Sequence, residues 1–301
     1  MNARTAQKDT TATDKPTPPT QTDDARRAQV RMMWAGVADR WGAHADEVDA
    51  RGTELTRSML TKARVRHGDS VLELACGPGG AGLAAAELVG SEGEVVLSDA
   101  VEAMAAIAGQ RATARGLTNV RTATRNLEQI DEPDGMFDVV LCREGLMFAV
   151  DPGLAAREIH RVLRPGGRFV AAVWGPKIDN PWLSVIFDAV TAVIGITVPP
   201  PGMPGPFALA DASRLTEVVE AGGFQDVEIE TIPVPLRMPT FDAWWQRTTA
   251  IAGPVAAMIA HLDPATASAL EDHVRSAVQP YTTPAGLDFP GLALLVSARR
   301  P

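Results

Sequence analysis

The sequence contains few residues of the kinds that define several large protein classes. Only two of its 301 residues are cysteine, which excludes a disulfide framework. No apolar run approaches the roughly 18 residues that a membrane-spanning helix requires, and no pair of histidines or cysteines has the spacing of metal ligands. The net charge is −9 and no segment is rich in Lys or Arg, which argues against a nucleic-acid-binding track. We therefore expect a small-molecule substrate, with no metal ion, nucleic acid or membrane as partner.

The N-terminal segment also lacks features of a folded or exported chain. Residues 1–24 have almost nothing to bury, so we expect a disordered tail. The N-terminus has no apolar core of the kind found in signal peptides. Cys76 and Cys142 fall at the ends of predicted buried strands, where free thiols suit a reducing compartment. These features favour a cytoplasmic protein, which we expect to be a monomer or a homodimer.

A glycine-rich turn follows an apolar strand in the segment Val71–Gly80, whose sequence is VLELACGPGG. The glycines let the backbone approach a bound molecule closely, and the helix expected over 81–89 points its N-terminal amides at that molecule. Glu73 places a carboxylate near the strand end, where it suits a ligand with a cationic group, such as the ammonium of an amino acid. S-adenosylmethionine is a ligand of this type.

The same turn also matches another cofactor fingerprint. Gly77-x-Gly79-x-x-Gly82, with Asp99 at the end of the next strand, satisfies the dinucleotide pattern. A nicotinamide-dependent oxidoreductase is therefore an alternative. Glu73 and Pro78 favour the methyl donor, because a carboxylate sits badly beside a pyrophosphate and proline lacks the N–H that such a turn usually offers.

With this motif, the chain resembles the class I S-adenosylmethionine-dependent methyltransferases, in the branch of the ubiquinone and menaquinone biosynthesis enzymes. The resemblance is firm over about residues 30–175 and includes the strand Phe137–Cys142 and the turn Arg161–Arg168 into the next strand. Ala75 replaces the more usual first glycine of the motif, and we expect its small size to be tolerated.

The resemblance implies a set of cofactor contacts. Asp99 would hold both ribose hydroxyls, Met104 would pack on the adenine, and the side chains after the third strand would read the adenine amino group. Trp41 lies where an aromatic side chain often meets the methionine end. The full set is Trp41, Glu73, Ala75, Cys76, Gly77, Asp99, Ala100, Met104, Asn126, Leu127, Cys142 and Arg143.

Strand and helix patterns alternate through the middle of the chain, which predicts an α/β fold with a parallel sheet covered by helices on both faces. With the family's last two strands, this gives a Rossmann-like, mostly parallel sheet of seven strands. The expected strands are 70–75, 94–99, 119–124, 137–142, 167–174, 227–238 and 287–298, and the expected core helices are 80–89, 101–115, 153–163 and 212–221. Glu73, Asp99, Asn126 and Cys142 end successive strands, so we expect them to meet in one pocket.

Further helices flank this sheet and divide the chain into four parts. Apolar residues recur at helical spacing from Ala25 to Val48, followed by a helix at Thr53–Ala63. We expect an N-terminal helical cap (25–66), an S-adenosylmethionine-binding core (67–178), and a remainder (179–301) that completes the sheet. A helical lid, inserted before the last strand, is expected at about 179–210 and 241–283, with helices at 180–194, 241–251, 254–261 and 264–278.

Aromatic residues are absent between Val71 and Met136 and crowd the C-terminal third, which points to a substrate wall there. Trp244 and Trp245 point about 100° apart on a helix, so one could pack inward while the other faces a cleft. Met147 and Phe148 occupy the place where related O-methyltransferases often carry a histidine, and we assign all four residues to the substrate pocket. The hypothesis is an apolar acceptor, which a pocket lined by charged groups would contradict.

The expected reaction is transfer of a methyl group from S-adenosylmethionine to a small aromatic or polyketide-like acceptor, on oxygen or carbon, leaving S-adenosylhomocysteine. Such an in-line displacement depends mainly on alignment and exclusion of water. Glu144, His44 and His261 are the candidate bases, although proximity alone could suffice for an ionised acceptor. Besides the oxidoreductase, the alternatives are a non-catalytic S-adenosylmethionine-binding protein and a macromolecule methyltransferase.

Overall fold

The computed structural model describes residues 21–301, apart from the side chains at 21, 254 and 257. Most of the tail expected at residues 1–24 therefore lies outside the described residues. Residues 21–24 contradict that expectation, because they form the first turn of a helix, α1 (Gln21–Ala35). Asp23 and Asp24 favour this helix start, since carboxylates near an N-terminus interact well with the helix dipole.

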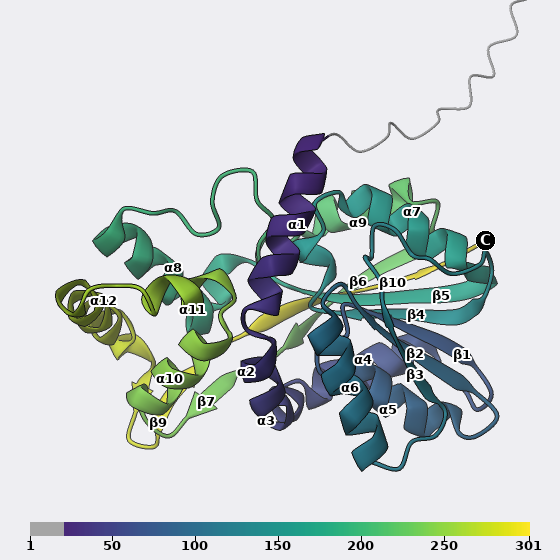
Figure 1. The fold of residues 1–301 in the computed structure, drawn as a ribbon, viewed down its shortest axis with the longest axis horizontal. Helices are drawn as coiled ribbons and strands as arrows, with labels where there is room; N and C mark the ends of the chain where they lie inside the picture. Colours follow the sequence, from purple (N-terminus) through teal and green to yellow (C-terminus); the bar gives the residue numbers. More distant parts are fainter. Residues whose placement is uncertain (1–20) are drawn as a thin grey trace, which may run out of the picture.

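A seven-stranded sheet forms the centre of the protein, in the order β3-β2-β1-β4-β5-β10-β6 (Figure 1). Only β10 runs antiparallel to its neighbours, so the expected mostly parallel Rossmann-like sheet is confirmed. Its strands are β1 (Ser70–Leu74), β2 (Glu94–Asp99), β3 (Val120–Thr124), β4 (Phe137–Arg143), β5 (Leu163–Trp174), β6 (Gln225–Pro233) and β10 (Leu292–Arg299). The central strands are almost continuously apolar because both of their faces are buried.

Helices cover both faces of the sheet, as Figure 1 shows. On one face lie α4 (Thr53–Ala63), α5 (Gly80–Val89) and α6 (Glu102–Ala114), and on the other lie α7 (Pro152–Val162) and α9 (Ala212–Ala221). Residues 125–136, all described, form no helix between β3 and β4. The N-terminal helix α1 reaches this place instead, where Arg27 pairs with Glu128 at 2.7 Å.

The cap is built from short helices rather than the single run expected from Ala25 to Val48. The chain breaks after α1, forms α2 (Ala38–Ala43) and α3 (Ala45–Arg51), and then enters α4 as expected. The break at Gly36 and Val37 lets α1 and α2 take different directions, and it buries Val37 and Ala38 against the core. Glycine favours such a break because its backbone loses the most freedom inside a helix.

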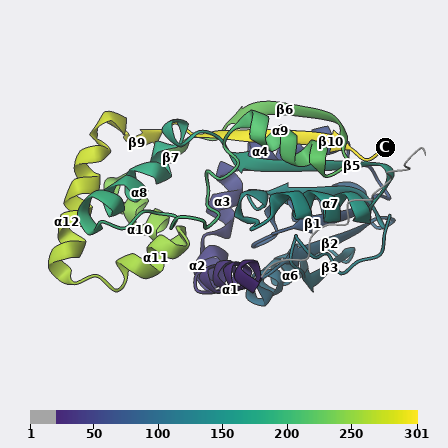
Figure 2. The same cartoon turned by 90° about the horizontal axis from the view of Figure 1, so that it is seen from above.

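A second lobe extends beyond the ends of β5 and β10, and α1 crosses the junction between sheet and lobe (Figures 1 and 2). It contains α8 (Pro181–Ile194), α10 (Phe241–Ile251), α11 (Pro254–Ile259) and α12 (Pro264–Ala277), with a small sheet of β7 (Leu236–Met238), β9 (Gly286–Phe289) and β8 (Thr282–Thr283). Three short 3-10 helices, Leu146–Phe148, Lys177–Asp179 and Gln279–Tyr281, complete the elements.

The two last strands are each split in two, which corrects the expected continuous pair at 227–238 and 287–298. β6 continues as β7 and β10 is preceded by β9, so the ribbon leaves the main sheet and forms part of the lobe. At the break the Val234 amide donates to the Gly291 carbonyl oxygen at 2.7 Å. A side chain at Gly291 would lie 2.0 Å from the Val234 oxygen, so this crossing requires glycine.

Candidate functional site

A cavity of about 320 Å³ opens where the carboxyl ends of β1, β2, β3 and β4 meet the cap. We call it the strand-end cavity. Ten of the twelve side chains or backbone positions expected to contact a cofactor line it: Trp41, Ala75, Cys76, Gly77, Asp99, Ala100, Met104, Asn126, Leu127 and Arg143. The topology thus brings together residues from three strand ends, the glycine turn and the cap.

Asp99 is held rigidly at the wall of this cavity. One carboxylate oxygen accepts from the Gly77 amide and the other from the Val101 amide, each at 2.9 Å. Burial raises the pKa of the Asp99 carboxyl, although the backbone N–H groups oppose the shift. Each oxygen keeps a further lone pair, so the carboxylate can still accept hydrogen bonds from ligand hydroxyl groups.

The turn between β1 and α5 is shaped by its backbone angles. Ala75 has a φ of 50° and Gly79 a φ of 88°, both in the left-handed region. For Ala75 this conformation costs on the order of 1–2 kcal/mol. Alanine in place of the usual glycine therefore introduces backbone strain, whereas the size of its side chain is not the problem. At Gly80 a side chain would lie 2.0 Å from an Asp49 oxygen, because the cap packs directly on the start of α5.

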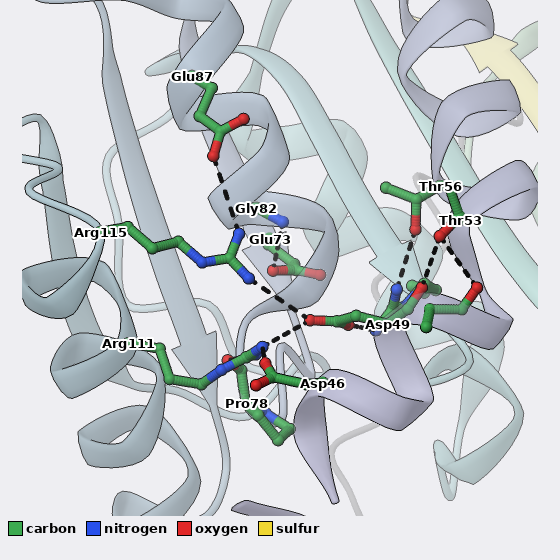
Figure 3. Close-up of polar contacts among 12 residues, drawn as sticks. Asp46, Asp49, Thr53, Thr56, Glu73, Pro78, Gly82, Glu87, Arg111 and Arg115 are labelled. Atoms are coloured by element: carbon green, nitrogen blue, oxygen red, sulfur yellow. Dashed lines mark hydrogen bonds and ion pairs between the residues drawn. The ribbon is translucent and has the colours of Figure 1, made fainter.

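Glu73 and Cys142, also expected to contact the cofactor, do not line the cavity. The Glu73 carboxylate lies under the turn, 1% exposed, and accepts from the Gly82 amide at 2.8 Å (Figure 3). Burial raises its pKa to about 7. Cys142 is completely buried, and burial raises the pKa of its thiol to about 12. Glu73 therefore supports the turn, and Cys142 packs in the core.

Asp49 of α3 ties the cap to the core, as Figure 3 shows. Its carboxylate accepts from Arg143 of β4 and from Arg111 of α6, each at 2.8 Å. Arg111 also donates to the carbonyl oxygen of Pro78 in the glycine turn, and Arg143 donates to Thr56 of α4. The two guanidinium groups lower the pKa of Asp49 despite its burial. Sequence reasoning missed this network, because its members are separated by up to 94 residues.

A second cavity, of about 210 Å³, lies between the cap, the end of β5 and the lobe. We call it the lobe cavity. Its walls are mostly apolar and include Trp34, Met147, Phe148, Trp174, Trp182 and Phe187, together with the proline-rich segment 198–206. Met147 and Phe148 were expected in the substrate pocket. The crowding of aromatic residues in the C-terminal third predicted a substrate wall, and Trp182 and Phe187 do line this cavity, whereas Trp174 at the end of β5 was not assigned to the pocket.

Trp244 and Trp245 do not line the lobe cavity, which corrects their assignment. Trp244 is completely buried, and its indole N–H donates to the Trp182 carbonyl oxygen at 3.2 Å. Trp245 stacks on Phe241, with ring centroids 6.1 Å apart. Both tryptophans therefore hold the lobe together. The side chains of α10 that do line the cavity are Arg247, Thr248 and Ile251.

The lobe cavity also contains charged groups, so its lining is apolar only in part. Arg51 places its guanidinium 3.9 Å from the Trp182 ring centroid and donates to the Val234 carbonyl oxygen at 3.0 Å. Burial lowers the pKa of Arg51 to about 9. Arg247 is 5% exposed, and its Nε donates to Glu47 at 3.0 Å.

Glu144 lies where the two cavities meet. Six residues line both cavities: Val30, Trp34, Trp41, Arg143, Glu144 and Phe148. Glu144 has a φ of 59°, and among the described side chains its carboxylate forms no hydrogen bond or ion pair. Such a strained residue at a junction of cavities suits a functional position. Burial raises the pKa of its carboxyl, while Arg143 and Arg51 oppose the shift.

The other two candidate bases lie away from both cavities. His44 sits between α2 and α3 with its Nδ1 3.4 Å from Glu47, and His261 is exposed after α11. Neither histidine lines the strand-end cavity or the lobe cavity, whereas Glu144 lines both. Within residues 21–301 no group of His, Cys, Asp and Glu is placed to hold a metal ion. No helix in that range is long and apolar enough to cross a membrane.

The comparisons with known proteins agree with this geometry. Residues 66–179 match the family model of a methyltransferase domain. The chain is similar to a ubiquinone/menaquinone biosynthesis C-methyltransferase of Francisella philomiragia, with 35% identity over 133 residues, 44% of this chain and 53% of that protein. A demethylmenaquinone methyltransferase of Geobacillus kaustophilus is 34% identical over 139 residues, 44% of this chain and 59% of the other. The chain thus spans little more than half the length of these relatives.

Among solved structures, the fold is similar to that of a putative methyltransferase from Bacillus halodurans. The TM-score is 0.56, with 19% identity, over 82% of this chain and 98% of the other. At this identity the likeness shows the fold alone.

Proposed function

Because residues 66–179 match the family model of a methyltransferase domain, we propose that the protein transfers a methyl group from S-adenosylmethionine to a small acceptor held in the lobe cavity. The observation that carries this proposal is the junction of the two cavities at Glu144 and Phe148. A donor in the strand-end cavity and an acceptor in the lobe cavity would meet there.

The residues of the strand-end cavity fit S-adenosylmethionine. Asp99 presents free lone pairs suited to ribose hydroxyls, Met104 offers an apolar face for the adenine, and Asn126 offers an amide for its amino group. The backbone of Gly77 in the glycine turn and the side chain of Arg143, which lines both cavities, suit the methionine end. When bound, the cofactor supplies an electrophilic methyl group on a sulfonium centre.

The protein's main contribution to the reaction is alignment. The rings of Trp34 and Phe148 pack edge to face with centroids 4.9 Å apart, and the Trp41 indole N–H donates to the Ile251 carbonyl oxygen at 3.0 Å. The cap and the lobe thus close the junction together and exclude water. Orientation of this kind can supply about 7–11 kcal/mol of a barrier. Glu144, whose carboxyl pKa is raised by burial, can accept a proton from an acceptor hydroxyl.

The acceptor that fits the walls is a small aromatic or polyketide-like molecule, methylated on oxygen or carbon. Tryptophan and phenylalanine side chains around the lobe cavity support a ring-shaped, mostly apolar compound. The relatives named above act in quinone biosynthesis, and a quinol or naphthol-type ring belongs to the same chemical class.

Cofactor binding is tested first, by titrating S-adenosylhomocysteine calorimetrically into the wild type and two variants. Asp99→Ala should weaken binding by about 5- to 150-fold, the equivalent of losing 1–3 kcal/mol of hydrogen bonds to a charged group. Asp131→Ala, at an exposed position, is the matched control and should bind normally. Equal affinities would place the nucleoside elsewhere, and stabilisation by a nicotinamide dinucleotide but not by S-adenosylhomocysteine would indicate an oxidoreductase.

Turnover is tested next, by incubating the protein with S-adenosylmethionine and a panel of hydroquinones, naphthols and polyketides. Mass spectrometry should detect an acceptor that gains one methyl group in step with S-adenosylhomocysteine. Glu144→Gln should lower kcat with little change in cofactor affinity if the carboxylate takes the proton. Unchanged turnover would mean that alignment alone suffices, and cofactor binding without any methylated product would indicate a binding protein.

A further inference from the structure

Two polar residues of α10, Arg247 and Thr248, line the lobe cavity, and each has one atom without a hydrogen-bond partner. The Arg247 Nη1 and the Thr248 Oγ1 atoms are completely buried, and neither has a partner among the described residues. The residues themselves are only 5% and 1% exposed. A buried donor left unpaired costs about 1–3 kcal/mol, so such groups are usually satisfied by a protein group, an ordered water or a bound ligand.

One of the cations around these atoms, Arg51, has no ion-pair partner among the described residues. The lobe cavity is lined by Arg51, Arg143 and Arg247 against one carboxylate, Glu144. Arg143 pairs with Asp49 at 2.8 Å. Arg247 pairs with Glu47 at 3.0 Å. Arg51 has no carboxylate within ion-pair distance among the described residues and donates only to backbone carbonyl oxygens. An anion entering this cavity would therefore meet the Arg51 cation, which has no ion-pair partner, and an Arg247 N–H without an acceptor, in a poorly hydrated place.

The rest of Arg247 is already positioned, which leaves the unpaired nitrogen in a defined place. Its Nε is fixed by Glu47 of α3, so the guanidinium is oriented by a bond from the cap. Arg51 is likewise fixed by its stacking on Trp182 and by the Val234 carbonyl oxygen. The two guanidinium groups are thus held in advance by protein contacts beside the same cavity, as a built binding site requires.

We propose that this end of the lobe cavity binds an anionic oxygen of the acceptor, a carboxylate or an ionised phenol or enol, on an otherwise apolar ring. Arg247 and Thr248 donate hydrogen bonds to that oxygen and Arg51 adds charge. The ring lies against Trp174, Trp182 and Phe187. The proposal rests on the proposed function, which it narrows: the acceptor is an amphipathic anion and not a neutral hydrocarbon-like compound.

The test is calorimetric titration of three probes into the full chain saturated with S-adenosylhomocysteine. Naphthalene-2-carboxylate represents the carboxylate, 4-nitrophenolate at pH 8.5 the ionised phenol, and 2-acetylnaphthalene the neutral ring. At least one anion should bind ten-fold or more tightly than the neutral probe, and the tighter anion identifies the oxygen. Equal binding of all three probes would overturn the proposal.

Variants of Arg247 and Thr248 test whether these two residues cause the preference for an anionic probe. Arg247→Gln should weaken binding of the preferred anion at least ten-fold, and Thr248→Val should weaken it at least three-fold. Binding of the neutral probe should change less than two-fold in both variants. Arg57→Gln, at an exposed position of α4, is the matched control. Thr248→Val keeps the side-chain shape, so it answers the question even if Arg247→Gln fails to fold. Anion affinity unchanged in both variants would refute the assignment.

A separate titration distinguishes this inference from the proposed function. S-adenosylhomocysteine also carries a carboxylate, and it is titrated alone into each variant. Its affinity should be the same in Arg247→Gln, Thr248→Val and the wild type. Loss of that affinity in these variants would mean that the cofactor's own carboxylate occupies the site, which overturns the inference but leaves methyl transfer intact. Failure of the wild type to bind S-adenosylhomocysteine would instead refute the proposed function.

Discussion

Replacing Glu73 by glutamine should change how the stability of the protein depends on pH. The carboxyl group is 1% exposed, and burial raises its pKa from 4.5 to about 7. Below pH 4.5 it is protonated in both the folded and the unfolded chain. As the pH rises from 4.5 to 7, the unfolded chain releases its proton first, so the wild type loses stability over this interval. Above pH 7 the loss is complete and constant.

The size of the effect follows from the shift. One pKa unit corresponds to about 1.4 kcal/mol, so a rise of roughly 2.5 units amounts to about 3 kcal/mol in total. Part of this is already lost at pH 5, which leaves about 2.5 kcal/mol between pH 5 and pH 8. Glutamine has the same shape and can still accept from the Gly82 amide, but it does not titrate. The variant should therefore gain about 2.5 kcal/mol over the wild type between these two pH values.

The assay is urea unfolding of both proteins at pH 5, 6, 7 and 8, with the free energy of unfolding taken from each curve. Glu102→Gln, in the exposed first turn of α6, is the control and should follow the wild type at every pH. Parallel pH profiles for Glu73→Gln and the wild type would show that the Glu73 carboxyl is not desolvated in the folded protein, and the reasoning would fail.

Three further changes test the cap and the turn. Asp49→Asn removes the ion-pair partner of Arg143, whose side chain is only 10% exposed. The free energy of unfolding, measured in urea, should fall by about 2–4 kcal/mol. Ala75→Gly removes the strain of an alanine in the left-handed region, so thermal unfolding should show no loss of stability. The same substitution at an exposed helix position, Ala106→Gly in α6, should lower the free energy of unfolding by about 1 kcal/mol. Trp41→Phe removes the hydrogen bond to α10, and hydrogen exchange in α1 and α2 should become faster by about the factor of 5 that 1 kcal/mol represents.

The order of elements could be read from the sequence because local signals agree with the final fold. Apolar runs of strand length, glycine stops and helical spacing placed β2, α5, α9 and α10 at their observed bounds. The cap was harder, since the spacing of apolar residues continues across Gly36 although the helix does not. Only packing of α1 and α2 in different directions against the core decides that break.

The sequence predicted where the candidate site lies, but not which side chains near the strand ends line it. Strand ends indicated where Asp99 and Asn126 would meet, since parallel strands end at one side of a sheet. Arg143 and Cys142 were both expected at the cavity, but adjacent strand residues face opposite sides, so only Arg143 lines it and Cys142 is buried. Glu73 was misplaced for a related reason, as α5 packs over its carboxylate.

What the sequence by itself determined is the methyltransferase-type sheet, its glycine turn and the strand-end acid Asp99, because these depend on contiguous residues and a fixed chain order. Only the tertiary structure decided the character of the lobe cavity. Arg51, Glu144 and Arg247 come from the cap, the sheet and the lobe, and they share one space only after these parts pack together. Packing also withdraws their charges from water, and this desolvation, which a linear sequence does not show, gives the proposed acceptor site its electrostatic character.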